Sequence, residues 1–210
     1  MTARVVPDGP AAREEAAEIL ASGGVVGLPT DTVYGIAVAR GTSGGVERLF
    51  AIKQRPPDKA VVLLIDDLDQ VADLVRATPA ARALSGLWPG GLTLVLPEAA
   101  GDGTIAVRVP DHPAPRALAR TVGPIPTTSA NLSGEPEART AAEVMAALGG
   151  SLALILDGGP SPGGIPSTVV DCTALPVRIL RTGAIPAAAI DERLTAAGLE
   201  RSAPAAVVGR

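Results

Sequence analysis

The sequence contains little that would support several common classes of protein. Its 210 residues include one cysteine, Cys172, and one histidine, His112, so we expect neither an internal disulfide nor a zinc site. Three aromatic residues (Tyr34, Phe50 and Trp88) are too few for a base-stacking platform. The net charge of −4 argues against a protein that coats nucleic acid by bulk electrostatics. Any anion must therefore be held by a local cluster of cations.

Long apolar runs are also absent. No uncharged segment approaches the length of a membrane span, and the first residues lack the basic-then-apolar order of a signal peptide. We therefore expect a cytoplasmic protein that does not enter a membrane. The hydrophobic content of 47% is enough to bury a core and excludes wholesale disorder. We expect a single catalytic domain over residues 1–198, followed by a loose C-terminal tail over residues 199–210.

Short apolar runs separated by glycine and proline predict an α/β fold with a mixed sheet. We expect a helix over residues 10–22 and a second helix that is capped by Thr42 and ends at Lys53. The acidic start of residues 66–75 suits the N-terminus of a third helix. Thr140 with Glu143 predicts a capping box, and a last helix begins at Pro186. Strands are expected at residues 25–28, 36–39, 60–65, 92–96, 104–109, 152–156, 167–171 and 177–180.

Two residue types are scarce enough to be informative. Sixteen of the eighteen basic residues are arginine, the two lysines are Lys53 and Lys59, and Asn131 is the only asparagine. If the composition has drifted away from lysine and asparagine, these survivors, with Tyr34, mark positions where other residues fail chemically. The alternative is that two lysines in one loop are chance and that Asn131 occupies a turn. If both lysines can be replaced by arginine without loss of activity, the hypothesis that these positions require lysine is wrong.

Common catalytic motifs are missing from the sequence. It contains no P-loop, no G-x-G-x-x-G segment between a strand and a helix, and no G-x-S-x-G elbow. His112, in the segment RVPDHP, is expected to be a solvated or helix-capping residue rather than a catalytic base. A hydrolase is therefore poorly supported.

Small polar loops stand at the ends of the expected strands. Each joins hydroxyl or amide groups to a nearby cation, which suits a ligand with both phosphate and amino-acid character. The loop KQRPPDK places Lys53, Arg55 and Lys59 within seven residues, although a solvated basic turn is the alternative. The loops are PTDTVYG, KQRPPDK, TIAVRVP, TTSANLSG, GGIPSTVVD and RILRTG.

The succession of these segments resembles the YrdC-like threonylcarbamoyl-AMP synthases. PTDTVYG, FAIKQRP, WPGGLTLVL, IAVRVP, TSANLSG, PSTVVD and RILRTGAI follow one another in order from about Glu14 to Ile185. The resemblance implies an α/β fold with an open, twisted mixed sheet, flanking helices and a large concave cavity. It also implies that L-threonine, bicarbonate or CO2, and ATP react to give threonylcarbamoyl-AMP and pyrophosphate. The product would serve tRNA threonylcarbamoyladenosine modification by a threonylcarbamoyl transferase complex.

The resemblance also implies roles for individual residues. Its K-x-R signature falls on Lys53 and Arg55, which would be catalytic, and its S-x-N signature on Ser129 and Asn131. Threonine would be bound by Thr32, Arg108, Ser129 and Ser167. ATP would be bound by Lys53, Arg55, Lys59, Thr104, Asn131 and Arg181. Mg2+ would arrive with ATP rather than occupy a protein metal site, and we expect Asp31 to brace its turn.

The sequence departs from the family pattern at two positions. Leu64 stands where many members have histidine, and Ala60 where they have proline, so a contact to threonine or bicarbonate is lost or made by backbone. No additional C-terminal domain of longer members is expected. Two alternatives stay open: a non-catalytic module that binds double-stranded RNA or tRNA, weakly in view of the charge, and a carbamoyl-transferring unit of hydrogenase maturation proteins, which normally has further zinc-binding cysteines.

Overall fold

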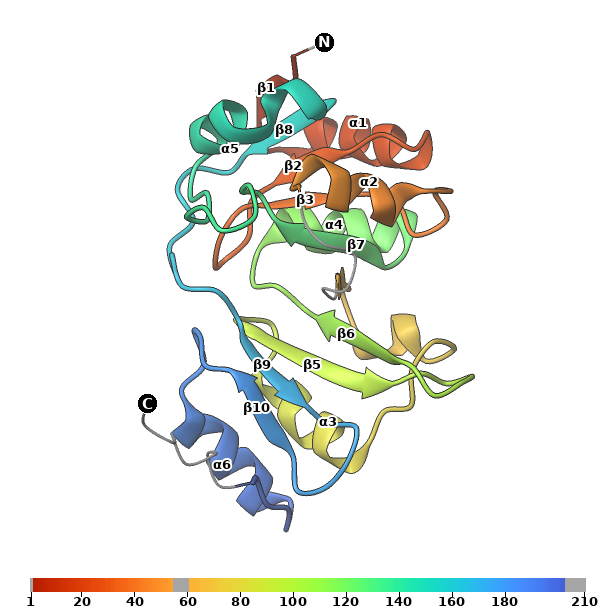
Figure 1. Ribbon diagram of the computed structural model, residues 1–210, viewed down its shortest axis with the longest axis vertical. Helices are drawn as coiled ribbons and strands as arrows, with labels where there is room; N and C mark the ends of the chain where they lie inside the picture. Colours follow the sequence, from red (N-terminus) through yellow and green to blue (C-terminus); the bar gives the residue numbers. More distant parts are fainter. Residues whose placement is uncertain (1, 55–60, 203–210) are drawn as a thin grey trace.

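The computed structural model describes residues 2–54 and 61–202, and within them an open ten-stranded mixed sheet forms the centre of the molecule (Figure 1). The strands are β1 (Arg4–Pro7), β2 (Val26–Leu28), β3 (Gly35–Ala37), β4 (Val62–Leu64), β5 (Leu92–Pro97), β6 (Thr104–Arg108), β7 (Ile125–Ser129), β8 (Leu154–Asp157), β9 (Thr168–Asp171) and β10 (Arg178–Arg181). Their order in the sheet is β1-β8-β2-β3-β7-β4-β6-β5-β9-β10. The predicted mixed α/β sheet is confirmed.

The helices cover the sheet in two groups. They are α1 (Pro10–Ala21), α2 (Gly45–Ile52), α3 (Pro79–Leu84), α4 (Pro113–Val122), α5 (Ala141–Leu148) and α6 (Ala187–Ala196). Helices α1, α2, α4 and α5 lie around β1, β8, β2, β3 and β7, whereas α3 and α6 lie beside β5, β9 and β10 (Figure 1). The antiparallel pair β7–β4 joins these two halves of the sheet. None of the helices in the described ranges combines the length and apolar composition needed to cross a membrane.

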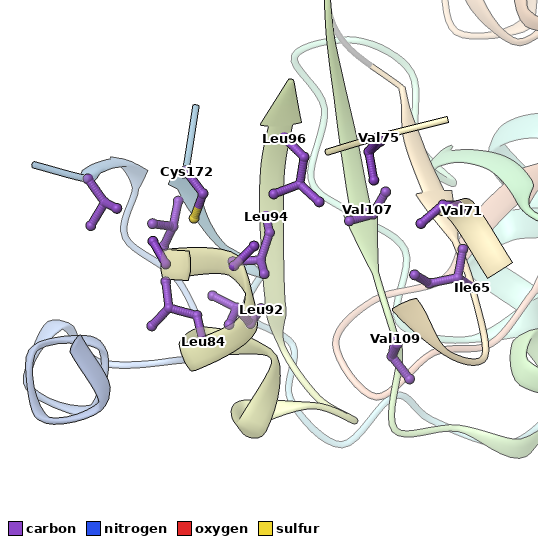
Figure 2. Packing of buried hydrophobic residues seen from close by; sticks show 14 of the residues in the cluster. Ile65, Val71, Val75, Leu84, Leu92, Leu94, Leu96, Val107, Val109 and Cys172 are labelled. Atoms are coloured by element: carbon purple, nitrogen blue, oxygen red, sulfur yellow. The ribbon is translucent and has the colours of Figure 1, made fainter. Parts of the chain in front are cut away.

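Strand alternation divides the buried side chains among three clusters. On β8, Leu154 and Leu156 pack with α1 and α4, while Ile155 between them packs with α2 and α5 on the other face. The third cluster lies in the other half of the sheet, where Leu92, Leu94 and Leu96 of β5 pack against α3 and α6 (Figure 2). Both halves of the sheet therefore have their own apolar support.

Local sequence signals account for several of these elements. Helix α1 has Pro10 at its first turn and is followed by Gly23 with a φ of 86°, the left-handed conformation that glycine adopts without strain. The predicted capping box is present: Thr140 Oγ1 accepts from Glu143 N at 3.2 Å, and Glu143 Oε2 accepts from Thr140 N at 3.2 Å. These predictions, which rest on local hydrogen bonding, are confirmed.

The capping box leads to a stability prediction. Thr140→Ala is expected to lower the free energy of unfolding by about 1 kcal/mol, because the first turn of α5 loses a hydrogen-bond acceptor. Urea unfolding followed by circular dichroism measures the change. Thr121→Ala is the control, since its exposed hydroxyl only bonds back to Ala117 O within α4. Equal stability of the Thr140 variant and the wild type would contradict the prediction.

Other predictions were wrong. Thr42 does not cap α2, because the helix begins at Gly45 after Gly44, and Thr42 lies in the preceding turn. Residues 66–75 form only a short 3-10 helix, Leu68–Val71. Four elements, β1, α3, α4 and β7, were not predicted from the sequence. Strand β7 has the polar sequence IPTTS, yet it pairs with a strand on each side and is largely buried.

The C-terminal segment is attached where it is described. The Arg201 side chain forms an ion pair with Asp191 of α6 at 2.7 Å. The Arg201 backbone forms an isolated parallel β-bridge with Val177, which precedes β10. Ser202 N donates to Val177 O at 2.8 Å. Residues 199–202 of the expected tail are thus fastened to the domain, and residues 203–210 lie outside the described residues.

Candidate functional site

A cavity of about 270 Å3 lies where the two halves of the sheet meet. Its lining comes from β3, β4, β5, β6, β7, β9 and β10, from the loops that follow β2 and precede β9, and from the loop between β7 and α5. One part of the lining carries hydroxyl and guanidinium groups, and another part is aliphatic. This combination suits a small ligand with a charged end.

The residues predicted to bind threonine all line this cavity. They come from four separate segments of the chain: Thr32 after β2, Arg108 at the end of β6, Ser129 at the end of β7, and Ser167 before β9. Arg181, predicted to bind ATP, lines it as well. The structure therefore brings these five side chains together, while their roles in binding remain predictions.

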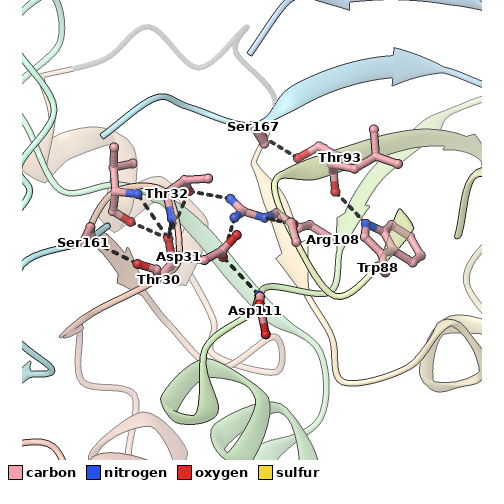
Figure 3. Close-up of polar contacts among 12 residues, drawn as sticks. Thr30, Asp31, Thr32, Trp88, Thr93, Arg108, Asp111, Ser161 and Ser167 are labelled. Atoms are coloured by element: carbon pink, nitrogen blue, oxygen red, sulfur yellow. Dashed lines mark hydrogen bonds and ion pairs between the residues drawn. The ribbon is translucent and has the colours of Figure 1, made fainter. Parts of the chain in front are cut away.

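Arg108 is almost completely buried, and its guanidinium donates three hydrogen bonds. Its Nη2 donates to Asp31 Oδ1 at 2.6 Å, Nη1 donates to Thr32 Oγ1 at 2.8 Å, and Nε donates to Gly90 O at 3.0 Å (Figure 3). Burial lowers the pKa of the Arg108 guanidinium, and the Asp31 carboxylate acts in the opposite direction. Asp31 Oδ1 also accepts from Asp111 N at 3.1 Å, so its side chain binds the end of β6 and the loop after it. The turn itself is braced by Thr30, whose Oγ1 accepts from Thr32 N and Val33 N.

Ser167 is held from two sides. Its hydroxyl lies 2.8 Å from Thr93 Oγ1 of β5, and Arg181 donates to Ser167 O at 2.9 Å and to Ser167 Oγ at 3.2 Å. Gly183 in the RTG segment makes this arrangement possible. A Cβ atom there would lie far inside van der Waals contact with the backbone of residues 166 and 167.

Lys53 lies behind the cavity lining. It follows α2 as the C-cap, its residue is 2% exposed, and its ammonium group joins the two signatures K-x-R and S-x-N. Nζ donates to Ser129 O at 2.5 Å, Ser129 Oγ at 3.2 Å, Asn131 O at 2.7 Å and Asn131 Oδ1 at 2.9 Å. The ammonium therefore holds the loop after β7, which includes Ser129 at the cavity wall.

Two further described residues predicted for ATP, Asn131 and Thr104, are not part of the lining. Asn131 is buried, and its Nδ2 donates to Glu135 O at 2.6 Å and to Leu132 O at 3.0 Å. Thr104 is exposed at the start of β6, on the strand face that it shares with Arg108. Arg55 and Lys59 lie outside the described residues, as does Ala60.

Several lining residues escaped the sequence analysis. Thr93 and Thr128 add hydroxyls, Glu137 adds a carboxylate, and an aliphatic wall comes from Val62, Leu64, Val95, Ala106, Val169 and Leu180. Period-two alternation on β5 could have indicated that Thr93 and Val95 share a face. Glu137 has no such signal, since it lies in a loop between β7 and α5. Leu64, where the family resemblance expects histidine, makes this part of the wall apolar.

The single histidine and the single cysteine of the chain are both away from the cavity lining. His112 caps α4, with its Nδ1 accepting from Ala114 N at 3.2 Å, and burial lowers its pKa, which favours the neutral form that this bond requires. Its capping role is confirmed. Cys172 is buried, which raises its thiol pKa to about 12. No group of three or more His, Cys, Asp or Glu that could hold a metal occurs among residues 2–54 and 61–202.

Tyr34 lines the cavity, so the ionisation of its hydroxyl depends on whether the cavity wall is folded. Its hydroxyl donates to Gly159 O at 2.7 Å and accepts from Gly158 N at 3.2 Å, and burial raises its pKa to about 12. In the unfolded chain the Tyr34 hydroxyl has its ordinary pKa of about 10. The unfolded chain therefore loses the hydroxyl proton at a lower pH than the folded protein does. The stabilisation linked to Tyr34 is therefore complete below pH 10 and is lost as the pH rises towards 12.

Absorbance of the phenolate tests this prediction, because Tyr34 is the only tyrosine of the chain. We expect the folded protein to titrate about two pH units above the chain in denaturant, with circular dichroism recording that it stays folded. Tyr34→Phe removes the signal and serves as the blank. Coincident titrations of the folded and denatured protein would refute the prediction.

Comparisons with known proteins show which family the chain resembles. Residues 18–183 match the family model named Sua5/YciO/YrdC and described as "Telomere recombination". A threonylcarbamoyl-AMP synthase of Bacillus subtilis is 40% identical over 184 residues, which cover 81% of this chain and 53% of the relative. A threonylcarbamoyl-AMP synthase of Vibrio cholerae is 37% identical over 184 residues, which cover 81% of this chain and 96% of the relative.

A solved structure shows the same similarity. Pyrococcus abyssi Sua5 complexed with L-threonine superposes with a TM-score of 0.86 at 32% identity, covering 96% of this chain and 62% of that one. The chain spans about half the length of the Bacillus relative and nearly all of the Vibrio relative. On the family match and these identities, the chain belongs to the Sua5/YciO/YrdC family.

Proposed function

We propose that this chain is an L-threonylcarbamoyladenylate synthase, a nucleotidyltransferase that makes threonylcarbamoyl-AMP and pyrophosphate from L-threonine, bicarbonate or CO2, and ATP. The observation that carries the proposal is the convergence of Arg108, Thr32, Ser167, Ser129 and Arg181 on one cavity. The names of the Bacillus and Vibrio relatives and the threonine complex of the Pyrococcus protein support the same activity.

In this proposal the polar part of the cavity binds the amino acid. A guanidinium carries five N–H groups, and three of those on Arg108 donate to described residues, which leaves two for a carboxylate. The hydroxyls of Thr32, Ser129 and Ser167 would surround the threonine side chain and amine. The cavity volume of about 270 Å3 suits a small amino acid with part of a nucleotide.

ATP would extend from the cavity along β6. Arg181 would meet its phosphates, and Thr104 would contact it farther along the face of β6 that carries Arg108. Lys53 and Asn131 would act by fixing Ser129 and its loop, and Arg55 and Lys59 would complete the cationic side. Magnesium would enter as part of the MgATP substrate, since Glu137 is the one carboxylate among the described lining residues.

The chemistry needs position and charge more than an acid or a base. The threonine amine adds to CO2 and releases a proton to water, which gives a carbamate. A carbamate oxygen then attacks the α-phosphorus of ATP, the bond from that phosphorus to the bridging oxygen breaks, and pyrophosphate leaves with the bond electrons. Holding the carbamate beside the α-phosphate would supply most of the acceleration through proximity, and the cations would stabilise the developing charge.

Incubation with MgATP, labelled bicarbonate and a panel of amino acids tests the proposal. We expect a labelled acyl-adenylate detected by mass spectrometry, together with pyrophosphate, with L-threonine only or in strong preference to serine and valine. No acyl-adenylate with any amino acid would refute the synthase. Salt-sensitive binding of tRNA or double-stranded RNA without ATP turnover would instead support the RNA-binding alternative.

The product suggests the protein's place among its partners. An acyl-adenylate is a reactive mixed anhydride, so a transferase that accepts it is required to place the threonylcarbamoyl group on tRNA. We propose that a threonylcarbamoyl transferase complex consumes the product. Production of modified tRNA on addition of such a complex to the reaction would test this step.

A further inference from the structure

The Asp31 carboxylate contacts the Arg108 guanidinium without lining the cavity itself. Arg108 lines the cavity and Asp31 does not, although their Nη2 and Oδ1 atoms are only 2.6 Å apart. The two residues are 77 positions apart in the chain. Asp31 follows β2 and Arg108 ends β6, and these strands belong to opposite halves of the sheet. Asp31 is therefore placed to act on a substrate only through Arg108.

We infer that Asp31 is a positioning residue, which orients the Arg108 guanidinium for the carboxylate of the amino-acid substrate. The inference rests on the proposed function and deepens it, because recognition of the substrate carboxylate then depends on both Asp31 and Arg108 rather than on Arg108 alone. Asp31 itself does not touch the substrate.

The geometry of the guanidinium supports this role. Arginine recognises a carboxylate through two parallel N–H bonds, which requires the plane of the group to be fixed. Three contacts fix that plane here, and the one to Asp31 is the shortest and the only one with an anion. Without Asp31, Gly90 O and Thr32 Oγ1 alone would hold a buried cation.

The charges around the cavity support it as well. Arg108 and Arg181 line the same cavity, and their mutual repulsion opposes a buried positive charge on Arg108. Asp31 offsets that repulsion from outside the cavity lining. Of the described lining residues Glu137 alone carries a carboxylate, so Asp31 supplies the balancing charge without competing for space in the cavity.

Asp31 also ties the position of Arg108 to the backbone. The same Oδ1 atom that binds the guanidinium accepts from Asp111 N, in the loop after β6. The PTD turn after β2 and the VPD turn after β6 therefore meet at one carboxylate oxygen. Arg108 at the end of β6 is held from its own loop and from the opposite half of the sheet.

The test measures KM for L-threonine and for ATP, with kcat, by pyrophosphate release from Asp31→Ala, Asp31→Asn and the wild type. Asp66→Ala is the matched control, because Asp66 forms 2.6 Å and 2.8 Å ion pairs with Arg116 and Arg120 at a similar side-chain exposure, 19% against 15%, outside the cavity. Thermal unfolding of each variant separates folding from binding.

We expect Asp31→Ala to raise the threonine KM by about tenfold or more and to leave the ATP KM within about twofold. Asp31→Asn keeps an acceptor oxygen and is expected to raise the threonine KM less, by about threefold. Asp66→Ala is expected to change neither value.

The outcomes separate this inference from the proposed function. An inactive wild type defeats the proposed function and the inference with it. An active wild type with an unchanged threonine KM in folded Asp31→Ala defeats the inference alone, as does an equal rise of both KM values. If Asp31→Ala does not fold, Asp31→Asn decides: a threonine KM equal to that of the wild type overturns the inference.

Discussion

Arg108→Ala is expected to lower kcat/KM for L-threonine by an amount equivalent to about 2 to 5 kcal/mol, because it removes a desolvated cation from the substrate end of the cavity. The substitution also leaves the half-buried Asp31 without its charged partner. The threonine dependence of pyrophosphate release, measured at saturating ATP, gives the size of the loss.

Two further variants make this prediction specific. Arg108→Lys keeps the charge but loses the planar fork, so it is expected to recover only part of the activity. Arg116→Ala removes an ion-paired arginine outside the cavity and is expected to behave like the wild type. An Arg108→Ala protein with a normal threonine dependence would show that the carboxylate binds elsewhere.

Lys53→Ala is expected to damage both stability and activity. The ammonium donates to four oxygen atoms of Ser129 and Asn131 in a buried site, and its removal leaves those acceptors without their charged donor. A loss of about 2 to 4 kcal/mol in the free energy of unfolding follows, which corresponds to roughly 4 to 16 °C in Tm. Activity is expected to fall as well, because Ser129 lines the cavity.

The measurements are Tm by differential scanning calorimetry and pyrophosphate release below the new Tm. Lys53→Arg is expected to fail to restore either property, since a planar guanidinium does not match oxygen atoms gathered around one nitrogen. Arg48→Ala on the same helix is the control, because Arg48 is exposed. Restoration of both properties by Lys53→Arg would contradict this account and the argument from scarce lysines.

The composition of the cavity lining indicates which class of ligand the cavity can bind. The aliphatic residues Val62, Leu64 and Val95 line the same cavity as several hydroxyls and two arginines. A ligand that is apolar on one side and anionic at one end fits such a lining better than a uniformly charged polymer does. The lining therefore favours the synthase over the RNA-binding alternative.

Local patterns in the sequence determined much of the fold. Runs such as LTLVL and LALIL became β5 and β8, glycine followed α1, and the Thr140–Glu143 capping box formed as expected. These features depend on residues within a few positions of one another, so the sequence contains all the information that they need. The motif order also indicated five of the residues that line the cavity, namely Thr32, Arg108, Ser129, Ser167 and Arg181.

The tertiary structure alone decided the rest. Burial of IPTTS as the central strand β7 depends on its neighbours β3 and β4, and the polar sequence gives no local sign of it. Lys53 binds oxygens 76 and 78 positions away, and Asp31 binds a guanidinium 77 positions away. Which partner a buried charge meets depends on how distant strand ends pack, because only packing brings them within hydrogen-bonding distance.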